Sequence, residues 1–80
     1  MKISEAVYES LSYITGLSAE ELSDIKDSDL FESGILDSLS FVQCITDVQE
    51  NTGLNINITE LDMTKCSTIT ELIDTLEELK

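Results

Sequence analysis

Apolar side chains recur every three or four residues in three parts of the chain, a spacing that places them on one face of a helix. This pattern predicts helices over residues 3–14, from about 38 up to 53, and over 69–80. Gly16 and Gly53 follow the first two segments, and glycine often ends a helix. We therefore expect three longer amphipathic helices.

The second predicted helix has more apolar positions than one narrow stripe needs. A stripe at helical spacing is flanked by two further apolar residues; the stripe comprises Leu39, Val42, Ile45 and Val48, and the flank Phe41 and Cys44. The pattern predicts that the stripe faces the core.

Two connections link these helices. The longer one, residues 17–37, mixes apolar with acidic residues, and its Ser18 and Glu21 match a capping box, which predicts a short helical turn over 18–23. In the shorter one, residues 54–58 alternate apolar and polar as a strand would, but no partner strand is found in the sequence, so we expect an extended connector. Thr59 is then expected to cap a short helix over 60–64.

These elements predict an all-α fold: a four-helix bundle of three longer helices and one short helix, with a long loop between helices 1 and 2. Thr68 and Glu71 match a second capping box ahead of the last helix, which we expect to end at Lys80. No linker or repeat interrupts the pattern, so residues 1–80 are expected to form a single domain.

Composition narrows the function classes. Seventeen acidic residues against four lysines leave a net charge of −13, and the chain has no histidine. Such a charge repels nucleic acids and anionic membranes and attracts basic protein surfaces. Without histidine, a Ser-His-Asp or Cys-His catalytic unit is excluded, so we expect no enzyme. No apolar segment is long enough to span a membrane, and we expect a cytoplasmic monomer.

Metal chemistry is not expected either. Two cysteines cannot complete a tetrahedral zinc site, and Cys44 and Cys66 are expected to be reduced thiols packed in the core. The acidic cluster over residues 24–32 matches no register of an EF-hand loop, so no calcium site is predicted.

The segment 29–42 carries the candidate chemistry. Its loop ends at Asp37 and delivers the Ser38 hydroxyl to the start of a helix, where free N–H groups and the helix dipole stabilise a negative group. A phosphoester on Ser38 would suit that position. Two other interpretations remain open: Ser38 serves only as the N-cap, or Asp37 is the cap and Ser38 the first helical residue.

Asp37-Ser38-Leu39 at a predicted helix start resembles the acyl carrier protein family of phosphopantetheine-binding carrier domains. The resemblance covers nearly the whole chain and implies an acyl-carrier-like bundle in which a phosphopantetheinyl transferase attaches 4'-phosphopantetheine to Ser38. It further implies that the arm carries acyl or aminoacyl groups as thioesters, received from a loading enzyme and passed to downstream synthases with basic patches. The segments 35–39 and 58–62 also look like those of D-alanyl carrier proteins.

By the same resemblance, four residues are candidates for partner recognition: Asp37, Leu39, Asp47 and Glu50. Leu39 is either an exposed apolar contact or part of the core stripe, and Asp47 and Glu50 are either recognition acids or ordinary solvated charges. Typical fatty-acid carriers have more acids along this helix than this chain does, which argues against docking to housekeeping fatty-acid enzymes. We therefore expect a specialised lipid, polyketide or aminoacyl pathway. The competing hypotheses are an unmodified acidic helical protein-interaction module and a small hydrolase using Ser38, which lacks a base.

Overall fold

The computed structural model describes residues 1–79, and its helices follow the predicted pattern closely. The α-helices are α1 (Ile3–Thr15), α2 (Ala19–Asp24), α3 (Ser38–Thr52) and α4 (Ile69–Glu77). Two short 3-10 helices, η1 (Ile58–Glu60) and η2 (Met63–Lys65), lie between α3 and α4, and no strand occurs in residues 1–79. The predicted all-α, acyl-carrier-like class is confirmed.

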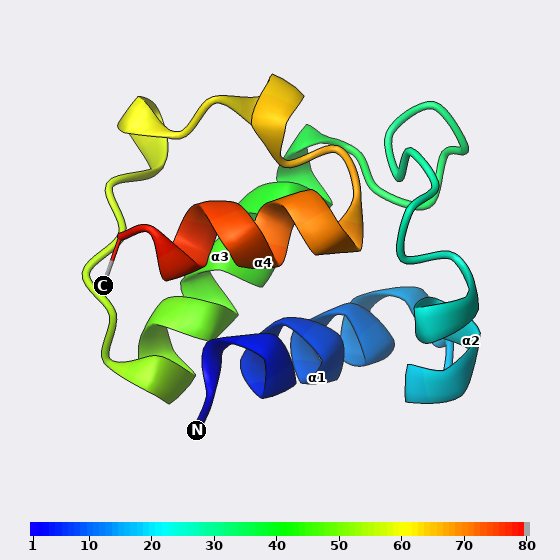
Figure 1. Cartoon of the computed structure of the whole chain (residues 1–80), viewed down its shortest axis with the longest axis horizontal. Helices are drawn as coiled ribbons and strands as arrows, with labels where there is room; N and C mark the ends of the chain where they lie inside the picture. Colours follow the sequence, from blue (N-terminus) through cyan, green and yellow to red (C-terminus); the bar gives the residue numbers. More distant parts are fainter. Residues whose placement is uncertain (80) are drawn as a thin grey trace.

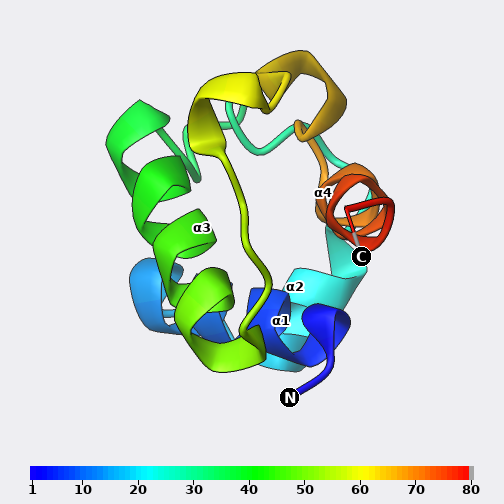
Figure 2. The ribbon, with the colours of Figure 1, turned by 90° about the vertical axis from the view of Figure 1, so that its left-hand side faces the viewer.

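The helices enclose one core. Figure 1 shows α1 along the lower edge with α2 beside its end, and Figure 2 shows α3 and α4 on opposite sides of the molecule. α1 contacts α2, α3 and α4, and is the element that joins them. The fully or nearly fully buried apolar side chains come from every α-helix and from the connections: Ile3, Ala6, Val7, Leu11, Leu22, Leu30, Leu36, Phe41, Cys44, Ile45, Val48, Ile56, Cys66, Ile69, Leu72 and Leu76.

The predicted caps set most helix boundaries. Gly16 and Gly53 follow α1 and α3 with φ of 77° and 73°, a left-handed conformation that glycine adopts without steric cost. The Ser18 hydroxyl accepts a hydrogen bond from the N–H of Glu21, whose carboxylate accepts one from the N–H of Ser18. The capping box predicted for the first connection is therefore confirmed, and it begins α2.

The predicted short helix over 60–64 is wrong. Instead, the Asn57 side chain accepts a hydrogen bond from the N–H of Thr59 and begins η1, and the Asp62 side chain accepts one from the N–H of Thr64 and begins η2. Leu61 between them is extended, with φ −76° and ψ 131°. Two caps five residues apart each start a turn of their own, so one continuous helical turn does not form.

Other expectations for the chain can also be compared with the structure. Before α4, the Thr68 hydroxyl accepts a hydrogen bond from the N–H of Glu71, which is one half of the second predicted capping box. The connector after Gly53 is extended, as predicted, and Cys44 and Cys66 are buried free thiols. The predicted end of the last helix at Lys80 lies outside the described residues; α4 itself ends at Glu77. No helix within residues 1–79 combines the length and apolarity needed to cross a membrane.

Candidate functional site

Asp37 caps α3. Its backbone is extended, its Oδ1 accepts a 2.8 Å hydrogen bond from the N–H of Ser40, and its carbonyl accepts one from the N–H of Phe41. Of the interpretations that the sequence left open, the structure therefore selects Asp37 as the cap and Ser38 as the first helical residue. The hydrogen bond from the Ser40 N–H, followed by one from the Ser40 hydroxyl, holds the pKa of Asp37 below its ordinary value, so this carboxylate is negative.

Ser38 is exposed at the head of α3. Its hydroxyl forms no hydrogen bond with any other side chain or backbone group of residues 1–79. The N–H groups of the first helical turn have no partners within the helix, and the positive end of the helix dipole lies there. An accessible hydroxyl at this place fits a covalently attached phosphodiester, which a helix N-terminus stabilises.

Backbone hydrogen bonds hold the loop before Asp37 against the residues around the start of α4. The N–H of Leu30 donates a 2.7 Å hydrogen bond to the carbonyl of Ser67, and the N–H of Thr70 donates to the carbonyl of Lys26 at 3.1 Å. The N–H of Leu36 returns to the carbonyl of Leu30 at 3.0 Å, and both leucines are buried. The loop that delivers Ser38 is thus fastened to the start of α4.

Asp29 organises the turn inside this loop, a role that the sequence analysis missed. Its Oδ1 accepts hydrogen bonds of 2.9 Å from the N–H groups of Phe31 and Glu32. The Phe31 ring then packs against Phe41 of α3, with ring centroids 5.7 Å apart and planes tilted by 58°. The signal was present in the sequence, since aspartate two residues before a turn commonly bonds the backbone in this way.

The apolar stripe predicted for α3 is rotated relative to the core. Phe41, Cys44, Ile45 and Val48 are buried, whereas Leu39 is 79% exposed and Val42 is 44% exposed. Val42 was expected to face the core with this stripe, and that prediction is wrong, because α1 and the loop pack on the side of the helix that carries Phe41 and Cys44. Of the two alternatives left open for Leu39, the structure shows the exposed side chain. Leu39 is therefore an apolar side chain in solvent, one residue after Ser38.

The two candidate acids of α3 have different surroundings. Glu50 is exposed, and it lies on the same face as Leu39 by helical spacing. Asp47 is half-buried, and its Oδ2 accepts a 3.0 Å hydrogen bond from the Ser10 hydroxyl of α1. Ser10 itself is buried, and it lies beside the Cys44 thiol, whose pKa is raised to about 11 by burial. Asp47 thus joins α1 to α3.

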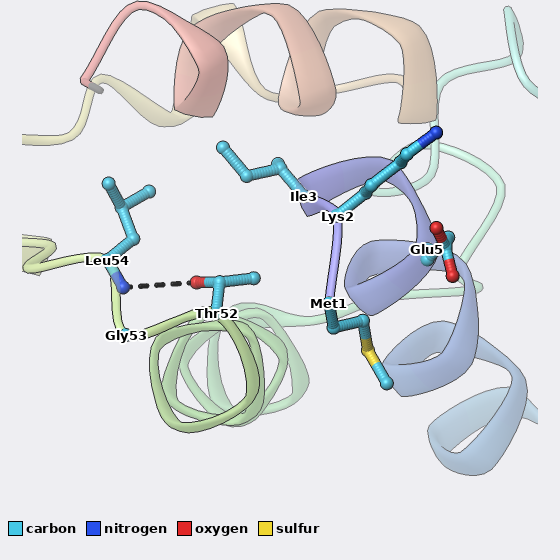
Figure 3. A pocket seen from close by; sticks show the side chains of 7 residues that line it. All are labelled: Met1, Lys2, Ile3, Glu5, Thr52, Gly53 and Leu54. Carbon is cyan, nitrogen blue, oxygen red and sulfur yellow. Dashed lines mark hydrogen bonds between the residues drawn. The ribbon is translucent and has the colours of Figure 1, made fainter.

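A hollow of about 590 Å³ lies at the other end of α3, between its last residues and the start of α1. Figure 3 shows Ile3 and Leu54 facing it from two sides, and the N–H of Leu54 donating to the Thr52 hydroxyl. Because α3 rises about 1.5 Å per residue, this hollow is about 20 Å along the helix from Ser38. It does not adjoin the exposed serine.

Within residues 1–79, no group of three or more cysteine, aspartate and glutamate side chains is arranged to hold a metal ion.

Comparison with known proteins defines the class. Residues 5–76 match the protein family described as "Phosphopantetheine attachment site". The chain belongs to this family of carrier proteins, which hold 4'-phosphopantetheine covalently. Among the relatives, the D-alanyl carrier proteins of Streptococcus pyogenes serotype M5 (strain Manfredo) and serotype M1 are each 32% identical over 80 residues, covering all of this chain and 98% of theirs.

Proposed function

We propose that Ser38 is the residue that receives the phosphopantetheine arm. The observation that carries the proposal is the exposed Ser38 hydroxyl at the first position of α3, directly after the Asp37 cap. A phosphopantetheinyl transferase would direct Ser38 Oγ onto the phosphorus of coenzyme A that bears the pantetheine. A phosphodiester then forms, adenosine 3',5'-bisphosphate leaves, and the hydroxyl proton passes to a base of the transferase. The bound arm supplies a terminal thiol for thioester formation.

An aminoacyl cargo is favoured over a fatty acyl or polyketide chain. The relatives of equal length are named D-alanyl carrier proteins. In addition, α3 has few acids for basic fatty-acid enzymes: of the two, Asp47 is engaged by Ser10, and only Glu50 is exposed. D-alanine or another small amino acid, loaded by an adenylating enzyme, is therefore the proposed cargo.

The proposed surface for these partners surrounds the head of α3. Leu39 and Val42 offer an apolar contact, and Glu50 extends the same side of the helix with a negative charge. Asp37 lies beside the attachment point, and its carboxylate is held by the first turn of the helix. Asp47 would act indirectly: its hydrogen bond with Ser10 helps to hold α3 against α1, and Asp47 would not touch these partners itself.

The test of Ser38 is an intact-mass measurement after incubation with coenzyme A and a broad-specificity phosphopantetheinyl transferase. We expect one phosphopantetheinyl group on the chain, none on Ser38→Ala, and one on Ser40→Ala, which removes a neighbouring hydroxyl from the same turn. A chain that gains no mass, or a Ser38→Ala variant that still gains it, contradicts the proposal. Normal function of Ser38→Ala in its pathway would favour the unmodified interaction module instead.

The cargo is tested on protein to which the phosphopantetheine arm has already been attached. A D-alanine-activating adenylating enzyme with ATP is expected to add one D-alanyl group, which hydroxylamine releases as expected for a thioester. An acyl-activating enzyme with a long-chain fatty acid serves as the comparison. Preferential loading of the fatty acid would reject the aminoacyl cargo while leaving the assignment of Ser38 intact.

A further inference from the structure

The outer surface of α1 has an aromatic residue that the core does not use. Tyr13 is 81% exposed, more than any other large hydrophobic side chain in residues 1–79. α1 lies along the lower edge of the molecule in Figure 1. A tyrosine side chain in this position is available for contact with another molecule.

Tyr13 and Glu9 form a ridge between two shallow hollows. One hollow, of about 500 Å³, lies toward α2 and is lined by Glu5, Tyr8, Glu9, Ser12, Tyr13 and Ala19. The other, of about 460 Å³, lies toward α3 and is lined by Glu9, Ser10, Tyr13, Gln43, Asp47 and Asn51. Glu9 and Tyr13 are the two residues that line both. The surface is therefore shaped to receive a segment that straddles the ridge.

The charge of this surface is uniformly negative. Glu5, Glu9 and Asp47 line the hollows, and no lysine within residues 1–79 does. Glu5 and Glu9 are four residues apart on α1, where like charges repel by about 0.2–0.5 kcal/mol. A cation placed between them would relieve that repulsion, whereas an acidic protein, a nucleic acid or an anionic membrane would increase it.

We propose that this α1 ridge is a second docking surface, which binds a basic protein segment carrying arginine or lysine. A guanidinium or ammonium group of the partner would lie over the face of the Tyr13 ring and contact the Glu9 carboxylate. Exposed tyrosine paired with arginine is a common energetic centre of protein interfaces. The ridge thus offers both the apolar face and the charge that such a group needs.

The ridge is separate from the surface around Ser38. Asp47, at the edge of the second hollow, is nine residues from Ser38 along α3, which corresponds to about 13 Å of helix. A partner can therefore hold the ridge while the head of α3 stays free. This inference does not rest on modification of Ser38, and its test uses the full chain without an arm.

The test is a titration of the isotope-labelled chain with a capped amphipathic peptide that has arginines on one helical face, followed by NMR. We expect the largest shifts in the amides of residues 5–13 and in the ring protons of Tyr13. The double variant Glu9→Gln, Tyr13→Ser should bind the peptide about tenfold more weakly, which corresponds to about 1.4 kcal/mol. A peptide with glutamine in place of arginine should not bind.

A matched control separates the ridge from general attraction to a negative protein. Asp74→Asn with Leu79→Ser also removes one carboxylate and one exposed hydrophobic side chain, but on and after α4. We expect this control to bind the peptide like the unaltered chain. Equal weakening in both variants, shifts centred on Leu39 and Val42, or an absence of binding would each overturn the proposal. Circular dichroism of both variants verifies that they remain folded.

Discussion

Asp37 shows how one side chain defines the start of the site. Its carboxylate accepts the N–H of Ser40, which makes Asp37 the cap and leaves the neighbouring serine hydroxyl without a structural task. Had Ser38 been the cap, its oxygen would have been occupied by a backbone N–H of the first turn. The identity of the cap therefore decides whether Ser38 Oγ is accessible to a transferase.

The charge on Asp37 leads to a prediction about pH. Its folded-state pKa lies below the ordinary value of 3.8, so the ionised carboxylate stabilises the fold at neutral pH, and this stabilisation is lost as pH falls through the lowered pKa. We expect Asp37→Asn to melt at a lower temperature than the unaltered chain at pH 7, and the difference to vanish in acid. Thermal melts followed by circular dichroism measure it.

The control for this pH dependence is Asp27→Asn, which removes an exposed carboxylate of the loop. Its melting temperature should differ little from that of the unaltered chain at pH 7. A difference between Asp37→Asn and the unaltered chain that stays constant from neutral to acidic pH would show that the charge of the cap has no part in stability.

At the scale of the elements, α3 presents different residues on each side. One side is buried against α1 through Phe41, Cys44, Ile45 and Val48. The outer side exposes Leu39 and Glu50. Between the two sides, the Asp47 carboxylate accepts a hydrogen bond from the Ser10 hydroxyl of α1. This hydrogen bond is a polar link across the α1–α3 contact, to which α3 otherwise contributes buried apolar side chains.

The Ser10–Asp47 pair predicts a measurable coupling between α1 and α3. In a double-mutant cycle of Ser10→Ala and Asp47→Ala, we expect the free energies of unfolding to be non-additive by about 0.5–3 kcal/mol, because removing either partner already breaks the same bond. Urea unfolding provides the free energies. The cycle of Ser10→Ala with Glu50→Ala is the control, and it should be additive within about 0.5 kcal/mol. Additivity in both cycles would leave Asp47 as a surface acid.

At the scale of the whole molecule, the net negative charge is high for so small a protein. The net charge of −13 is distributed over a body of 27 × 24 × 20 Å. The Debye length is about 30 Å at 0.01 M salt and about 10 Å at 0.1 M. At low salt every carboxylate therefore repels every other across the molecule, whereas at 0.1 M only neighbours interact.

We accordingly expect the melting temperature to rise when sodium chloride is increased from about 0.01 M to 0.1 M, because screening reduces self-repulsion in the folded state. Differential scanning calorimetry measures the change. A variant with Asp27→Asn, Glu32→Gln and Asp74→Asn has fewer charges to screen and should show a smaller rise. A melting temperature that is constant or falls with salt would contradict this account.

Much of this fold could be predicted from local signals. The capping box at Ser18, the glycine that ends α1 and the apolar spacing of α4 each depend on neighbouring residues, and each prediction holds. The predictions that fail concern segments in which more than one residue could cap a turn or face the core. Thr59 was expected to cap a helix, but Asn57 and Asp62 cap two turns instead.

The sequence by itself determined that the chain is an acidic helical bundle with a serine at the head of its second long helix, since periodicity, capping residues and charge are properties of short segments. Only the tertiary structure decided which face of α3 is buried, because both Leu39 and Phe41 are apolar and the packing of α1 selects between them. It also decided that Asp47 joins two helices and that Tyr13 lies in solvent. Those assignments depend on contacts between residues far apart in the chain, and helical spacing alone does not contain them.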